Sequence, residues 1–128
     1  MSIPSQSPIH YGYASASDMT WSRSEKVIAR QAFDAALKRE LHELMQEAKE
    51  IADRIKQPSD LWDLQEYLSR RRKEIDHTYN YRYSHLTQVF GRLLYETRLS
   101  EQELRGFSED KLRTIRSLAK FLAEEDAA

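Results

Sequence analysis

The chain has 128 residues, with no Cys, 3 Gly and 3 Pro, and its 20 basic and 21 acidic side chains leave a formal net charge of −1. The lack of Cys excludes a disulfide scaffold, a cysteine-ligated zinc site and a cysteine nucleophile. A balanced charge provides no overall attraction to nucleic acid, no apolar run approaches the roughly 20 residues of a membrane span, and so few Gly and Pro residues favour long helices.

Residues 1–20 contain one formally charged side chain, Asp18, and show no periodic apolar spacing. Because this segment is rich in Ser, Pro and Tyr, we expect a flexible N-terminal tail. It has neither the basic start nor the apolar stretch of a secretory signal, and the cytoplasm is therefore the expected location.

A long helix is predicted from Ser22 to Lys56. Ser22 and Glu25, three residues apart, have the spacing of a capping box at a helix start. Apolar side chains then recur at alternating spacings of four and three residues, which is typical of a heptad seam. The seam consists of Leu37, Leu41, Leu44, Ala48, Ile51 and Ile55. Pro58 follows, and a helix cannot continue there without losing a hydrogen bond.

The second helix is expected to begin with a cap at Ser59 or Asp60. One of its faces is apolar, with Arg72 on or beside it. This face carries Leu61, Leu64, Leu68 and Ile75. The pattern continues less cleanly through the Tyr-rich residues 79–83 into residues 86–94. We expect a break near Asn80, which leaves open whether one helix or two span this region.

Two further start signals follow, namely Ser100 with Glu103 and then Ser108, with Gly106 supplying the turn between them. The last helix has an apolar face. This face consists of Leu112, Ile115, Leu118, Ala119 and Leu122. Residues 124–128 are expected to fray. The sequence thus predicts an all-α fold, in which residues 21–123 form one helical domain with a long hairpin stem, about 22–80, and a small head, about 81–123.

The length of the first helix predicts an oligomer. A helix of about 33 residues is roughly 50 Å long, whereas a compact domain of this size has a radius near 14 Å by the usual scaling. A two-helix hairpin of that length has a single layer and cannot cover its own apolar seam. The simplest cover is a second copy packed about a two-fold axis, and we therefore expect an elongated homodimer.

Catalytic chemistry finds little support in the residues. Glu74 and His77 have the Glu-x-x-His spacing of di-iron bundles, but no second motif accompanies them, and a solvated helix face is the favoured interpretation. No Ser lies in a G-x-S-x-G turn, and the dispersed Gly residues do not form a phosphate-binding loop. We expect no catalytic residue, no metal and no cofactor, and therefore not an enzyme.

The basic run Arg70–Lys73, followed by the Tyr-rich residues 79–83, could combine phosphate contacts with base stacking. Against this, Glu66, Glu74 and Asp76 lie within a turn or two and would pair with the same cations. Ion pairs within the stem and at a dimer interface are the favoured interpretation. A nucleic-acid-binding helical dimer is kept as an alternative.

Trp62 lies in the first turn of the second helix, and Trp is a frequent hot-spot residue at interfaces. The stretch Asp-Leu-Trp-Asp-Leu-Gln-Glu-Tyr-Leu-Ser at residues 60–69, continuing through Arg72 and Tyr79 to Arg82, resembles the fluorescence recovery proteins of cyanobacteria. The resemblance extends from Trp21 into the last helix and omits only the two tails.

This resemblance implies an all-helical dimer with a long stem and small heads. It also implies a partner, the photoactivated orange carotenoid protein, whose return to the orange form the family hastens, so that quenching of the phycobilisome ends. It implies no chromophore or other cofactor. The family residues that matter for dimer and partner contact fall on Trp62, Gln65, Glu66 and Arg72, with head contacts at Gln88, Phe90 and Thr114.

Several of these positions depart from the family pattern. Gln65 stands in place of a His, Glu66 in place of an Asp, Gln88 in place of a Phe and Thr114 in place of a Lys, whereas Phe90 keeps its aromatic ring. Two functions therefore stay open beside the nucleic-acid alternative. One is a regulator of the carotenoid protein, and the other is a related dimeric scaffold that serves a different protein partner.

Overall fold

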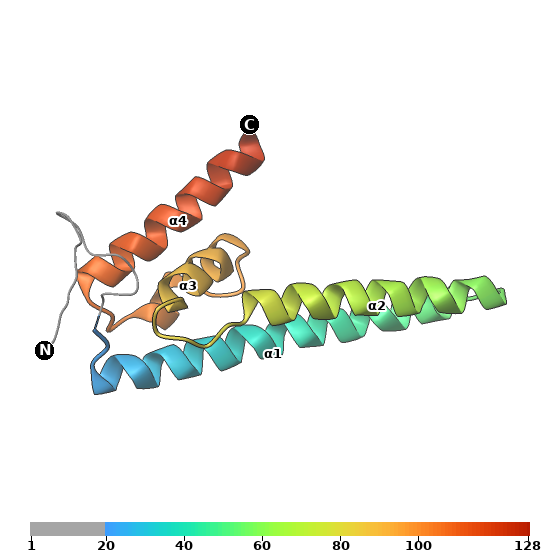
Figure 1. The fold of residues 1–128 in the computed structure, drawn as a ribbon, viewed down its shortest axis with the longest axis horizontal. Coiled ribbons are helices and arrows are strands. Elements are labelled where there is room, and N and C mark those ends of the chain that lie inside the picture. Colours follow the sequence, from blue (N-terminus) through green and yellow to red (C-terminus); the bar gives the residue numbers. More distant parts are fainter. Residues whose placement is uncertain (1–19) are drawn as a thin grey trace, which may run out of the picture.

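The computed structural model describes residues 20–128, so the tail expected over residues 1–20 lies outside the described part except for Thr20. All regular secondary structure of the described chain is helical, with no strand. Its elements are α1 (Arg23–Asp53), α2 (Pro58–Thr78), α3 (Leu86–Tyr95), the 3₁₀ helix η3 (Glu101–Leu104) and α4 (Glu109–Ala127). Figure 1 shows α1 and α2 side by side as a long hairpin, with α3 and α4 gathered at one end. This confirms the predicted all-α stem and head.

Local signals fix the start of α1 as predicted. The Ser22 hydroxyl accepts a hydrogen bond from the Glu25 N–H at 3.1 Å, and the Glu25 carboxylate accepts from the Ser22 N–H at 2.9 Å. The helix ends at Asp53 rather than at Lys56. Beyond Asp53 the chain tightens into single turns, in which the Ile55 N–H donates to the Ala52 carbonyl.

The predicted cap of α2 at Ser59 or Asp60 is wrong, because both residues lie inside the helix and Gln57 is its N-cap. Pro58 begins the helix instead of merely ending the preceding one, since the first helical position needs no N–H donor. Asp60 helps from within, where its carboxylate accepts from the N–H groups of Lys56 at 2.9 Å and Gln57 at 3.2 Å.

The break near Asn80 is confirmed. The helix α2 ends at Thr78, and α3 begins at Leu86, so two helices span the region that the sequence left open. The start of α4 also agrees, because the Ser108 hydroxyl accepts from the Lys111 N–H at 3.3 Å. The expected fraying from residue 124 is not seen. The helix continues to Ala127, as the high helix propensity of Ala and Glu permits.

The main core lies in the head and along the adjoining half of α1. On α1 it includes Ala29, Ala32, Phe33 and Ala36, and in the head Leu86, Val89, Phe90, Leu93, Leu99, Leu104, Phe107 and Ile115. A β-carbon added to Gly91 would lie 2.8 Å from Leu118 Cδ2, so α3 and α4 approach as closely as a glycine allows. Gly106 makes its turn at φ +109°.

The stem is less well covered than the head. Ile75 is the one buried residue of α2, and Leu41, Met45 and Leu61 keep 42%, 55% and 49% of their surface exposed. A single layer of two helices therefore leaves its seam partly open, as the length argument requires. No helix among the described residues is long and apolar enough to cross a membrane.

Candidate functional site

An apolar surface runs along the stem, and we call it the stem strip. It consists of Leu37, Leu41, Leu44 and Met45 of α1 with Leu61, Leu64, Leu68 and Ile75 of α2. Three hollows of about 660, 670 and 370 Å³ lie along it. The first two share Leu37 and Leu41, and Arg72 lines both of the last two, so the three hollows adjoin one another. Several of its side chains, among them Leu41, Met45 and Leu61, are exposed, and a large exposed apolar surface is typical of a protein interface.

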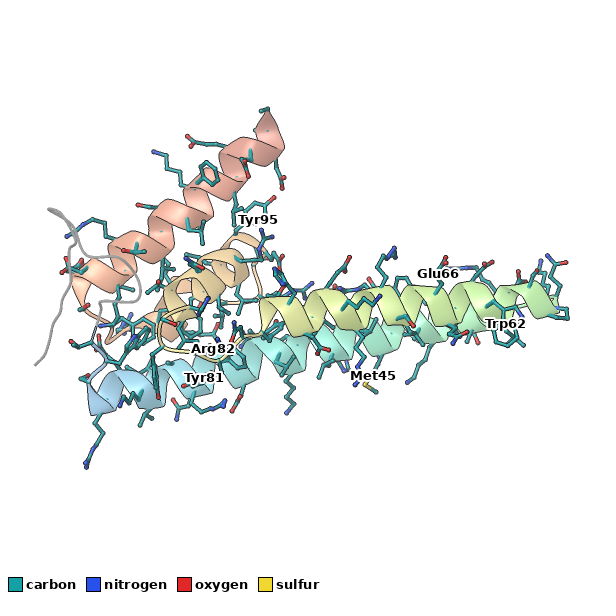
Figure 2. All side chains as sticks on the ribbon, viewed as in Figure 1. Met45, Trp62, Glu66, Tyr81, Arg82 and Tyr95 are labelled. Atoms are coloured by element: carbon teal, nitrogen blue, oxygen red, sulfur yellow. The ribbon has the colours of Figure 1, made fainter. Side chains whose placement is uncertain are left out.

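The predicted stem residues lie on or beside this strip. Arg72 and Gln65 line the hollow over α2 together with leucines. Trp62 is 66% exposed, and Figure 2 shows it near the tip of the stem, far from the head, with Glu66 on the same helix. Neither Trp62 nor Glu66 lines the hollow. Within a single chain, two of the predicted residues therefore lie at the strip and the other two on an adjacent face of α2.

Arg72 is a charged residue that lines two of the three hollows. Its side chain is 86% exposed, and its nearest carboxylate is Asp76 at 3.9 Å rather than Glu66. An exposed pair of this length contributes little to stability. The guanidinium is therefore available to a carboxylate on whatever covers the strip, where it would need such a partner once desolvated.

The head positions behave differently from one another. Gln88 is exposed and Thr114 is half-buried, with its hydroxyl donating to the Asp110 carbonyl at 3.0 Å. Phe90 has no exposed surface and packs 5.7 Å from the Phe107 ring. The head contact expected at Phe90 is thus corrected to a core role, because its spacing from Leu86 places both on the buried face of α3.

A buried charged cluster joins the stem to the head, and sequence reasoning missed it. Glu40 of α1 is 6% exposed. Its carboxylate accepts hydrogen bonds from Arg71 at 3.0 Å and the Tyr79 hydroxyl at 2.9 Å, and it lies 3.2 Å from Arg98 Nε. These partners come from the end of α2 and from the loop after α3. We call this cluster the Glu40 hub.

Burial changes the acidity of the groups in the hub. Burial and then the hydrogen bond to the Glu40 carboxylate raise the pKa of the Tyr79 hydroxyl well above its usual value. The sequence feature that could have revealed the hub is the position of Glu40, which follows Ala36 by four residues on the face of α1 that is buried against the head. A carboxylate on a buried stripe needs cations nearby, but the sequence does not say which ones.

A second ionic contact between stem and head, which we call the Arg39 clasp, lies beside the hub. Arg39 binds Glu103 of η3 through two hydrogen bonds, at 2.9 and 2.6 Å, and donates to the Arg98 carbonyl at 2.7 Å. Such a bidentate pair fixes orientation as well as distance. The hub and this clasp therefore fix the direction in which the head is held on the stem.

Within the basic run of α2, Arg71 is held closely by carboxylates, whereas Arg72 makes only the exposed 3.9 Å pair with Asp76. Arg71 pairs with Glu40 and with Glu74 at 2.9 Å, and Arg70 lies over the Tyr67 ring at 5.4 Å. Among residues 20–128, no group of three or more His, Cys, Asp or Glu side chains could hold a metal ion.

Comparison with known proteins shows where this scaffold recurs. The family described as photoprotection regulator fluorescence recovery protein matches residues 21–119. The fluorescence recovery protein of Synechocystis sp. (strain ATCC 27184 / PCC 6803 / Kazusa) is 38% identical over 100 residues, which is 78% of this chain and 92% of that protein.

Solved structures give the same result. The fluorescence recovery protein of Fremyella diplosiphon is 40% identical, with a TM-score of 0.75 over 79% of this chain and 99% of that one. The structure of the Synechocystis sp. PCC 6803 protein is 38% identical, with a TM-score of 0.75 and the same coverage. The matches include both the stem and the head. The chain therefore belongs to the fluorescence recovery protein family, whose members are regulators of photoprotection.

Proposed function

We propose that this chain is a cytoplasmic, non-enzymatic regulator that binds the photoactivated orange carotenoid protein and accelerates its return to the orange form. The end of phycobilisome quenching follows from that return. The observation that carries the proposal is the family match over residues 21–119, which includes the stem, the hub and most of α4. A regulator of this kind needs no catalytic residue, because it acts by binding.

The working form that we propose is a homodimer joined through the stem strip. Fully burying a Leu or Met side chain contributes about 1.5–3 kcal/mol, and Leu41, Met45 and Leu61 each keep about half of their surface open. A symmetric interface counts each of these residues twice. Arg72 would then lie inside the interface, and a carboxylate of the second copy would balance its charge.

Contact with the carotenoid protein is assigned to two places. On the stem we propose Trp62, Gln65 and Glu66, because Trp62 is large and exposed and its neighbours are polar. On the head we propose Gln88 and Thr114. A rigid scaffold that holds two parts of a partner raises the effective concentration of one part near the other. The hub and the Arg39 clasp supply that rigidity.

The alternative is a related dimeric scaffold with a different protein partner. The observation that favours it is Gln88, a polar residue at a head surface where the resemblance implies an aromatic one. Losing a buried ring at that contact would weaken binding by about 1–3 kcal/mol. A nucleic-acid role is not proposed, since Arg71 is held by Glu40 and Glu74.

The two functions are separated by mixing the purified protein with photoactivated orange carotenoid protein and timing the decay of the red form in darkness. The proposal predicts a faster decay that saturates with protein concentration. An unchanged decay at saturating protein would reject it in favour of another partner. Gln88→Phe is the informative variant, because a restored ring should accelerate the decay further if the head surface contacts this partner.

A further inference from the structure

A polar cavity of about 310 Å³ lies between the end of α2 and one face of α3. Its volume is at the lower end of the range for small-ligand sites. The cavity is lined mainly by side chains that can donate hydrogen bonds. These are His77, Thr78, Asn80, His85, Gln88 and Arg92. We call it the junction pocket, because it lies where the stem meets the head.

The arrangement of the donors follows from the two helices. His85, Gln88, Val89 and Arg92 have spacings of three, one and three residues, which places them on one face of α3. His77 and Thr78 belong to the last turn of α2, and Asn80 lies two residues beyond its end. Two independent elements thus direct donors into one cavity, with the buried Val89 as part of its wall.

The charge of the pocket is one-sided. Among the described residues that line it, none is a carboxylate, and Arg92 carries a fixed positive charge. Arg92 makes one long contact to Glu96, at 3.4 Å, through one of its five N–H donors. The amides of Asn80 and Gln88 add neutral donors, and the His77 imidazole adds at least one N–H. The His85 ring shares a hydrogen bond with the Ser84 hydroxyl at 3.0 Å and is not counted as a donor.

The two helix ends beside the pocket act in opposite directions. The first turn of α3 contains no acidic residue, and its N-cap, His85, makes no side-chain capping bond. The N-terminal dipole of α3 therefore favours an anion. The C-terminal end of α2 has the opposite sign, but His77, the basic residue of its last turn, stands there. Because the two helix ends have opposite signs, Arg92 and the hydrogen-bond donors decide that the pocket prefers an anion.

From these observations we propose that the junction pocket binds a compact oxyanion, with Arg92 as its charged anchor and the side-chain amides of Asn80 and Gln88 as orienting donors. The shared chemistry is that of a phosphate or a carboxylate group. Its source is either a free ion or an acidic side chain on a bound protein. This proposal rests on the lining of the cavity and stands whether or not the carotenoid protein is the partner.

The proposal is tested by NMR titration of the full chain, at constant ionic strength, with inorganic phosphate in one arm and sodium acetate in the other. The signals to follow are the side-chain amides of Asn80 and Gln88 and the Nε–H of Arg92. We expect saturable shifts confined to these groups. Saturation by phosphate alone assigns the site to phosphate, whereas comparable saturation by acetate assigns it to carboxylates, including those of proteins.

Two variants make the result decisive. Arg92→Gln removes the anchor and should weaken binding at least tenfold. Arg113→Gln is the matched control, because Arg113 is an exposed α4 arginine held by a nearby carboxylate, Asp110, at 2.9 Å. Gln88→Leu, which keeps the size and removes the donors, should weaken binding severalfold.

Equal affinity in Arg92→Gln and Arg113→Gln would mean adventitious ion binding only and would overturn the proposal. So would the absence of saturation in both arms. Neither result bears on recovery of the carotenoid protein, since that assay is separate. Failure of this proposal is therefore distinguishable from failure of the proposed function.

Discussion

Replacing Glu40 with Ala should destabilise the protein far more than removing an exposed carboxylate of the stem. Glu40 is 6% exposed, and the change leaves two guanidinium groups and the Tyr79 hydroxyl without their shared acceptor. Removing one member of a buried ion pair costs about 3–5 kcal/mol. Arg71 and Arg98 retain other carboxylates, Glu74 and Glu43, so we expect the lower end, about 3 kcal/mol.

The assay is urea unfolding at one fixed protein concentration, because the stability of an oligomer depends on concentration. Glu74→Ala is the matched control. Glu74 also binds Arg71, at 2.9 Å, but its side chain is 55% exposed, and loss of such a pair costs about 1 kcal/mol or less. Glu40→Ala and Glu74→Ala unfolding within about 1 kcal/mol of each other would refute the hub as a structural junction.

Three further changes test other parts of the account. Leu41, a residue of the stem strip, is 42% exposed, and Leu41→Asp removes about 1 kcal/mol of burial from each of two copies. Light scattering at dilute concentration should therefore show a dimer weakened by about 30-fold or more. An unchanged mass would exclude the stem strip as the interface. Gly91→Ala places a methyl group within 2.8 to 3.0 Å of Leu118 and should lower the free energy of unfolding by about 1–3 kcal/mol. A melting temperature equal to that of the wild type would contradict this and would show that α4 moves freely. Burial of Glu25 on its own raises its pKa, but hydrogen bonds from the Ser22 and Ser108 N–H groups and from Lys111 outweigh it and hold the pKa below its usual value. Stability from Glu25 is therefore fully present above its unfolded pKa and lost as the pH falls through the lower folded value, and Glu25→Gln should flatten acid unfolding curves in that range; a curve of wild-type slope would contradict this.

Local signals in the sequence predicted the element boundaries best. Ser22 with Glu25, Ser108 and Gly106 act within one turn of the backbone, and each was confirmed because the capping chemistry involves only neighbours. The first helix does end before Pro58, but the cap of the second was misplaced, because the same ring that cannot continue a helix is favoured at the first position of the next one. Its position relative to the boundary could not be decided from the pattern alone.

Contacts between distant segments could not be predicted in the same way. Arg71 and Arg72 are adjacent in a basic run, yet Arg71 enters the hub and Arg72 stays exposed on the strip. Their roles depend on the angle between α1 and α2, which only tertiary packing sets. For Phe90 the resemblance suggested a contact, whereas the ring is buried in the head core.

If this chain ends quenching by acting on the carotenoid protein, as we propose, recovery of phycobilisome fluorescence should depend on it. Phycobilisomes are quenched with photoactivated orange carotenoid protein, returned to darkness, and followed with and without the purified chain. We expect fluorescence to return faster in its presence, with a rate that saturates as the chain is added. Fluorescence that returns at the same rate at every concentration would contradict it.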